Sequence, residues 1–230
     1  MQVIPVIDLM GGEVVRARVG HRASYRPIET ALSPTSDAVD VVRGLLALYP
    51  FPTLYAADLD AIQRNGDNFS VLRRIRSEFP ELRIWIDSGA ADRDAVDALI
   101  RADLGELVIG SESQRDVALI SQHEDSRRIV LSLDFRGDAF QGPEEILTEP
   151  KLWPRRVIVM TLARVGSGAG PDLARLAAIG SIAGDREIYA AGGVRDASDL
   201  SALKTAGAAG ALIATALHDG RIVKADLQAI

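Results

Sequence analysis

The feature that most constrains the fold is a strict alternation of short apolar runs with longer amphipathic stretches along the whole chain. Such alternation is typical of parallel strands joined by crossover helices. Eight of the runs are long enough to be strands, and eight is the number of strands that closes an α/β barrel. The predicted strands span 2–7, 53–58, 83–87, 106–110, 129–134, 156–161, 187–191 and 210–214, and the clearest helical patterns span 37–49, 69–79, 94–102 and 172–182.

The second half of the chain repeats the first, as expected for a barrel built from two four-strand halves. The aligned pairs are 83–99 with 187–203 and 106–113 with 210–217, both 104 positions apart, and 4–12 with 130–138, which are 126 positions apart. We therefore predict one α/β domain, a (β/α)8 TIM barrel over 1–230, with half-barrels of about 1–124 and 125–221. The tail at 222–230 is either a final helix against the base of the barrel or an interface strand.

Composition excludes several classes of function. The net charge of −6 and the pI near 5.1 argue against general nucleic-acid binding, which requires a basic face. No cysteine is present, so disulfides, thiolate catalysis and zinc-thiolate sites are excluded. The histidines lack metal-ligand spacing, and we expect each of them at the surface: His21, His123 and His218.

The chain shows no signal for a membrane. The N-terminus MQVIPVIDL has no basic segment, and no apolar run approaches the roughly 18 residues that a membrane span needs. We therefore expect a cytoplasmic protein that is a monomer or a small homo-oligomer.

Two aspartates end corresponding strands of the repeat. Asp8 and Asp134 close the first and fifth predicted strands, so they should face each other across one mouth of the barrel. The carboxyl ends of the strands build the active site in barrels of this kind. A single carboxylate at a strand end is most often a helix cap, but a symmetry-related pair favours general acid and base catalysis.

Small residues and hydroxyls follow four other strands and predict two phosphate sites, half a barrel apart. Glycine turns let backbone N–H groups approach a phosphate, and phosphate sites after strands seven and eight are common in this fold. We predict a phosphorylated small-molecule substrate, with a phosphate at each end. The predicted site residues are Ser88, Gly89, Gly110 and Ser111 in the first half and Gly192, Gly193 and Thr215 in the second.

Arginines crowd the segment after the first strand, where bidentate capture of an anion is possible. They are Arg16, Arg18, Arg22 and Arg26. The stretch from 21 to 34 is predicted to be a mobile lid. The alternative is an ordinary solvated surface.

The order of motifs closely resembles the HisA/HisF family of histidine biosynthesis, and its HisA branch more than its HisF branch. The motifs are IPVIDLMGGEVVR (4–16), ADLDAI (57–62), VIGS (108–111), LSLDFR (131–136), RVGSGAGP (164–171) and AAGGVRDASDL (190–200). The resemblance implies a TIM barrel that isomerises a phosphorylated aminoaldose to a ketose by acid and base catalysis. It implies no metal and no organic cofactor.

Residue roles follow from the same resemblance. Asp8, Asp134 and Thr161 match the family's catalytic positions, and Arg16 matches a substrate-contacting arginine. The GxGP-like loop that contains Gly170 matches a substrate-binding loop, and the remaining glycines match the phosphate loops.

Two departures from the family pattern leave alternatives open. Val165 stands where HisA enzymes carry a second catalytic aspartate, and Asp87-Ser88-Gly89 stands where the family has three glycines. Asp8 and Asp134 could act as the acid and base by themselves, as in the HisF cyclase. A side branch of methanogens and methylotrophs shares the 57–68 stretch and suggests biosynthesis of pterin- or furan-linked C1 carriers. A phosphate-binding or partner subunit without catalysis is the third alternative.

Overall fold

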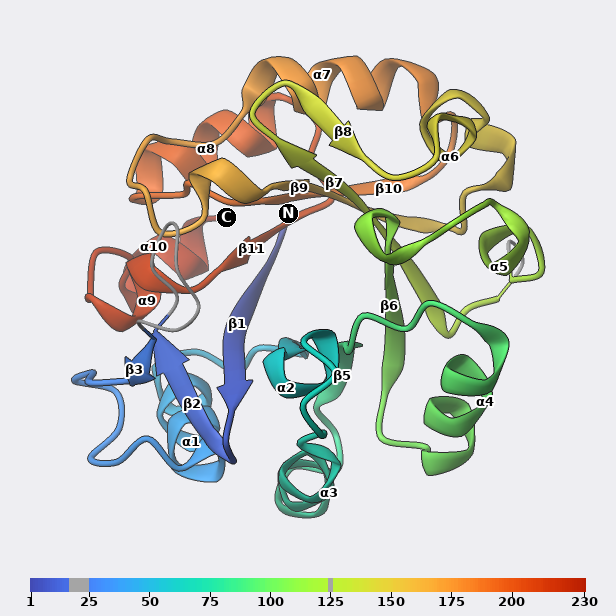
Figure 1. The fold of residues 1–230 in the computed structure, drawn as a ribbon. Helices are drawn as coiled ribbons and strands as arrows, with labels where there is room; N and C mark the ends of the chain where they lie inside the picture. Colours follow the sequence, from blue (N-terminus) through green and yellow to red (C-terminus); the bar gives the residue numbers. More distant parts are fainter. Residues whose placement is uncertain (17–24, 124–125) are drawn as a thin grey trace.

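The computed structural model describes residues 1–16, 25–123 and 126–230. Eight parallel strands close into a barrel, because the last strand pairs with the first (Figure 1). All eight predicted strands are confirmed. In barrel order they are β1 (Gln2–Met10), β4 (Thr53–Asp58), β5 (Arg83–Asp87), β6 (Glu106–Gly110), β7 (Ile129–Arg136), β9 (Arg156–Thr161), β10 (Glu187–Ala191) and β11 (Gly210–Ile213).

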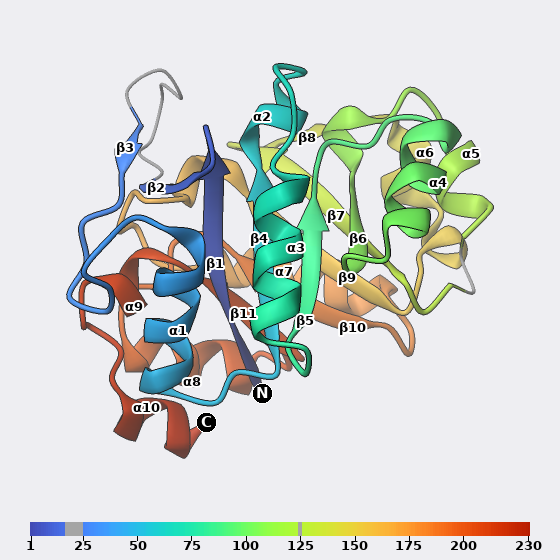
Figure 2. The ribbon, with the colours of Figure 1, turned by 90° about the horizontal axis from the view of Figure 1, so that it is seen from below.

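Helices surround the barrel on its outside (Figure 2). They are α1 (Ala38–Leu48), α2 (Leu59–Ile62), α3 (Phe69–Glu78), α4 (Arg93–Ala102), α5 (Ala118–Ser121), α6 (Glu144–Thr148), α7 (Leu173–Ile182), α8 (Ala197–Thr205), α9 (Thr215–His218) and α10 (Lys224–Ala229), with 3-10 turns η2 (Ser111–Ser113), η3 (Pro150–Leu152) and η4 (Leu162–Arg164). The four predicted helices are α1, α3, α4 and α7. An aspartate caps α1, α4, α7 and α8, and each of these side chains accepts N–H groups of the first turn: Asp37, Asp92, Asp172 and Asp196.

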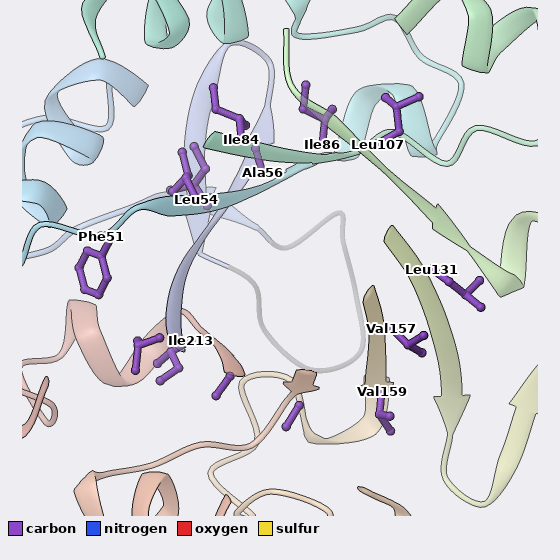
Figure 3. Close-up of a cluster of buried hydrophobic side chains, with 14 of the residues drawn as sticks. Phe51, Leu54, Ala56, Ile84, Ile86, Leu107, Leu131, Val157, Val159 and Ile213 are labelled. Carbon is purple, nitrogen blue, oxygen red and sulfur yellow. The ribbon is translucent and has the colours of Figure 1, made fainter. Parts of the chain in front are cut away.

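Alternation along the strands divides the core into two layers. Side chains such as Leu131, Val157 and Ile213 point away from the ring of strands and pack against the helices (Figure 3). The alternate side chains fill the barrel itself, where Trp85 packs edge-on against Tyr189 with ring centroids 4.9 Å apart. Buried on both faces, the strands read as nearly continuous apolar runs, as parallel strands do.

Two hairpins rise from the mouth of the barrel, and the sequence analysis did not predict them. Strand β2 (Glu13–Arg16) folds back on β1, and β8 (Ala139–Gln141) folds back on β7. Their registers correspond. Asp8 pairs with Val15, and the two residues 126 positions after these, Asp134 and Gln141, pair with each other. A short strand, β3 (Arg26–Pro27), extends the first hairpin.

A buried polar network holds the turn of the first hairpin. Asn68 is 2% exposed, and its side chain donates to Asp58 Oδ1 at 2.7 Å and to Asp60 Oδ2 at 2.8 Å. The amide of Gly11 donates to Asp60 Oδ2, and the amide of Gly12 donates to Asn68 Oδ1. The acidic stretch after β4 therefore anchors the glycine turn that follows β1.

Replacing Asn68 by Ala is expected to destabilise the fold by about 2–4 kcal/mol, because buried Asp58 loses a hydrogen bond and the Gly12 amide loses its acceptor. Urea unfolding followed by circular dichroism measures the change. Exposed Asn65 lies in the same loop, and Asn65→Ala should change the free energy of unfolding by no more than about 0.5 kcal/mol. Equal losses in the two variants would contradict the anchoring role.

The seam that closes the barrel joins the two ends of the chain. The Gln2 amide donates to the Ala209 carbonyl at 2.8 Å, and Gln2 lies opposite Gly210. The tail forms helix α10, which buries Leu227, so the helical alternative for 222–230 is the one observed. Within the described ranges, no helix has the length and apolar character needed to cross a membrane.

Candidate active site

A cavity of about 460 Å³ lies at the carboxyl ends of the barrel strands; we call it the mouth cavity. A volume of this size suits a small metabolite. The structure brings most of the predicted site residues together on its wall. Those that line it are Asp8, Arg16, Gly89, Gly110, Asp134, Gly192, Gly193 and Thr215.

Asp134 is a buried carboxyl group, 4% exposed, held on several sides. Ser132 Oγ donates to Asp134 Oδ1 at 2.7 Å, and the Glu112 amide donates to Oδ2 at 3.2 Å. Burial raises the pKa of Asp134 to about 7, against the opposing effect of the Ser132 hydrogen bond, and the nearby charge of Asp87 raises it further. Such a group can hold or release a proton near neutral pH.

Asp87 points into the barrel and lines the mouth cavity. The Tyr55 hydroxyl donates to Asp87 Oδ2 at 2.7 Å, and the Gly89 amide donates to Oδ1 at 3.1 Å. Burial raises the pKa of Tyr55 well above its usual value, and the charges of Asp87, Asp134 and Asp8 add to the rise. Three carboxyl groups therefore surround one buried tyrosine, which stays a protonated hydrogen-bond donor.

The loop after β10 packs tightly on the loop after β9. A Cβ on Gly193 would lie 2.2 Å from the Gly170 carbonyl oxygen, and a Cβ on Gly192 would lie 2.7 Å from that of Thr161. Both glycines have positive φ, +99° and +89° for Gly192 and Gly193. No described residue accepts a hydrogen bond from the amides of Gly193, Val194 or Thr215, and all three residues line the mouth cavity.

Arg16 extends from β2 toward the end of β11. Its guanidinium donates to Asp219 Oδ1 at 2.7 Å and to the Glu29 carbonyl at 3.1 Å, and it lines the mouth cavity. Arg26 lies on β3, exposed, and donates to the Tyr25 carbonyl. Arg18, Arg22 and His21 lie outside the described residues, as does the first part of the predicted lid.

The expectation that every histidine lies at the surface is wrong for His218. This side chain is 5% exposed, lines the mouth cavity, and its Nδ1 lies 3.3 Å from Thr30 Oγ1. Burial lowers the pKa of His218 to about 4, and the neighbouring Arg16 charge lowers it further. The ring is therefore neutral. His218 closes an apolar helix turn, and a pattern analysis gives no signal of its burial.

Other predicted site residues are not brought into the mouth cavity. Thr161 is 4% exposed, and strand alternation points it to the helix layer because Ile158 and Met160 are the inward residues of β9. Ser88 lines a different pocket, together with residues of α4 and α5, and the Gly170 carbonyl packs against Gly193. Ser111 Oγ donates to the Gln141 carbonyl at 2.7 Å and accepts the Asp134 amide at 2.9 Å, so this hydroxyl holds β7 and β8 together.

Residues that the sequence analysis missed complete the site. Ser132 lies two positions before Asp134 and so shares its face of the strand, which is a signal that could have found it. Tyr55 gave no such signal, because it sits in an apolar strand like any core aromatic. Val165 follows η4 and lines the mouth cavity. Among the described residues, no group of three His, Asp or Glu side chains is arranged to hold a metal.

These features define a class of protein: a (β/α)8 barrel whose mouth combines paired aspartates with a glycine loop after the seventh barrel strand and a threonine after the eighth. The sequence pattern of the histidine biosynthesis protein family matches residues 2–223. The chain belongs to this family, the HisA/HisF family.

Similar proteins include members of known and unknown activity. The chain is 28% identical over 222 residues to an uncharacterized protein of Methanocaldococcus jannaschii, covering 96% of this chain and 94% of that protein. It is 28% identical over 240 residues to the 1-(5-phosphoribosyl)-5-((5-phosphoribosylamino)methylideneamino)imidazole-4-carboxamide isomerase of Stenotrophomonas maltophilia, covering 96% and 95%. The isomerase of the same name from Xylella fastidiosa strain M23 is 26% identical over 239 residues, covering 96% and 86%.

Proposed function

We propose that the protein is an acid-base isomerase of the HisA type, which converts a phosphorylated aminoaldose into the corresponding ketose. The observation that carries the proposal is the pair of aspartates near the carboxyl ends of β1 and β7, both on the wall of the mouth cavity. Family membership and the isomerases among its relatives support the reaction class.

Each step of the reaction has a group of suitable chemistry. Asp134, with a pKa of about 7, is partly protonated at neutral pH and would give a proton to the ring oxygen as the sugar ring opens. Asp8 would then remove the proton from C2 of the open-chain iminium, so that the C2–H electrons form a C1=C2 bond and the C1=N electrons return to nitrogen. Protonation of this enaminol at C1 and loss of the proton from the C2 hydroxyl give the ketose. Two carboxyl groups can thus replace the arrangement that uses an acid at the position of Val165.

The phosphate group of the substrate would lie between the loops after β10 and β11. The amides of Gly193, Val194 and Thr215 face the mouth cavity there, with the guanidinium of Arg16 on the same side. Backbone N–H groups and an arginine are the usual partners of a phosphate.

The direct test is turnover of the substrate of the isomerases named above, followed by its change in absorbance, with Asp8→Asn and Asp134→Asn beside the wild type. N-substituted 5-phosphoribosylamines of other kinds extend the assay. Conversion that both substitutions abolish supports the proposal. Conversion that survives Asp8→Asn would remove Asp8 from the mechanism.

Replacing Gly193 by Ala is expected to weaken binding of a sugar phosphate at least about tenfold, because the new Cβ would collide with the Gly170 carbonyl and displace the loop. Isothermal titration with ribulose 5-phosphate measures the loss. Gly207 has a similar φ of +83° but open space around it, so Gly207→Ala imposes similar backbone strain without that collision. A matching loss of affinity in both variants would argue against a phosphate site at Gly193.

A cyclase of the HisF type is the second candidate. It is favoured by the same pair of aspartates on the first and fifth barrel strands, together with Val165 on the cavity wall. The two candidates differ in their products, because cyclisation requires an ammonia donor and isomerisation does not. Product formation that depends on added ammonium would select the cyclase.

A further inference from the structure

The two halves of the mouth cavity have different hydrogen-bonding capacity. The sequence repeat places a glycine loop after β5 and another after β10, so both halves could hold a phosphate. In the first half, however, two amides of residues that line the mouth cavity, those of Gly89 and Glu112, already have acceptors within the protein. The Gly89 amide donates to Asp87, and the Glu112 amide donates to Asp134.

The Ser111 hydroxyl in the first half also has hydrogen-bond partners within the protein. Ser111 Oγ donates to the Gln141 carbonyl and accepts the Asp134 amide, and Ser111 is fully buried. A phosphate that binds the Gly89 or Glu112 amide would therefore have to displace a carboxylate, and it would gain no hydrogen bond from Ser111. The second half keeps the amides of Gly193, Val194 and Thr215 without an acceptor among the described residues.

Charge divides the mouth cavity in the same way. The acidic residues on its wall come from β1, β5 and the β6 and β7 ends: Asp8, Asp87, Glu112 and Asp134. Four arginines lie among the described residues of the wall. Arg16 and Arg221 pair with Asp219 after β11 and Arg164 follows β9, whereas Arg136 lies exposed at the end of β7. A dianionic phosphate is attracted to the second side and repelled from the first.

We infer that the substrate carries one phosphate group, bound between the loops after β10 and β11, and presents hydroxyl or amino groups to Asp87 and its neighbours at the other end. The inference rests on the proposed function and narrows its substrate class. It separates this chain from the isomerases among its relatives, whose name describes a substrate with two phosphoribosyl groups.

Titration calorimetry with ribulose 5-phosphate and ribulose 1,5-bisphosphate tests the inference, because the two ligands differ by one phosphate. The wild type should bind the bisphosphate no more than about threefold more tightly than the monophosphate. Asp87→Gly frees the Gly89 amide and removes the charge, and should raise the bisphosphate affinity at least about tenfold without changing the monophosphate affinity. Asp87→Asn removes only the charge and keeps the shape, so it serves if the glycine variant fails to fold.

Asp92 offers a matched control. It caps α4 five positions later and does not line the mouth cavity, so Asp92→Gly should leave both affinities unchanged. A wild type that prefers the bisphosphate tenfold or more overturns the inference and leaves the proposed function standing. Absence of binding of either ligand to the folded wild type rejects the sugar-phosphate substrate itself.

Discussion

Asp134→Asn is expected to lower turnover about 10²–10⁴-fold, the range by which a positioned acid or base accelerates a reaction. The amide has the size of the carboxyl group but cannot transfer the proton, so the barrel should fold as before. Steady-state kinetics on an accepted phosphorylated aldose, with circular dichroism as the check on folding, measures the effect. Asp138 is exposed on the same hairpin, and Asp138→Asn should leave kcat/KM within about twofold.

The pH dependence separates a proton-donating role of Asp134 from a structural one. If the protonated carboxyl is the acid, kcat/KM should fall as pH rises through about 7, where Asp134 loses its proton. Ser132→Ala removes a hydrogen bond that favours the charged form, so the pKa of Asp134 should rise and the alkaline limb should move to higher pH. If the alkaline limb of the kcat/KM profile lies at the same pH in this variant, a group other than Asp134 causes it.

Trp85→Ala is expected to cost about 3–5 kcal/mol of stability, the usual effect of emptying a large buried site. Trp85 is 1% exposed inside the barrel, where it packs on Tyr189 and lies 5.5 Å below the Arg156 guanidinium. Denaturant unfolding followed by circular dichroism gives the change in free energy. The loss should appear in the midpoint rather than in the slope of the transition.

Trp85→Phe is the matched control. The indole Nε1 of Trp85 is buried and has no hydrogen-bond partner among the described residues, so phenylalanine loses area but no hydrogen bond. We expect it to cost clearly less than the alanine change. A phenylalanine variant as unstable as the alanine variant would mean that the indole nitrogen does have a partner.

The barrel could be predicted because its signal is periodic and repeated. Each strand is buried on both faces, so its apolar run stands out between amphipathic helices. The hairpins β1–β2 and β7–β8 could not be predicted in the same way. Both turns contain a glycine with φ near +60°, Gly11 and Gly137, but a glycine there is equally compatible with a phosphate loop.

The site was predictable where the repeat and strand alternation fix direction. Asp8 and Asp134 lie at corresponding positions on the inward face, two residues before the ends of β1 and β7, and the structure places both on the cavity wall. Thr161 follows the inward residue Met160, so the same alternation applied to β9 predicts that the Thr161 side chain points outward. The engagement of the Gly89 amide by Asp87 depends on side-chain hydrogen bonds, which no sequence period encodes.

The seam between β1 and β11 has a consequence for folding kinetics. It pairs Gln2 with Gly210, residues separated by nearly the whole chain, so among the strand pairings of the barrel it closes the longest loop and carries the largest entropic cost. The seam is also tightly packed, since a Cβ at Gly210 would lie 2.6 Å from the Tyr189 ring, so the last strand must dock in one register. The seam should therefore form after the local strand and helix units have assembled, so a nascent chain keeps an open sheet edge until its last strand is available.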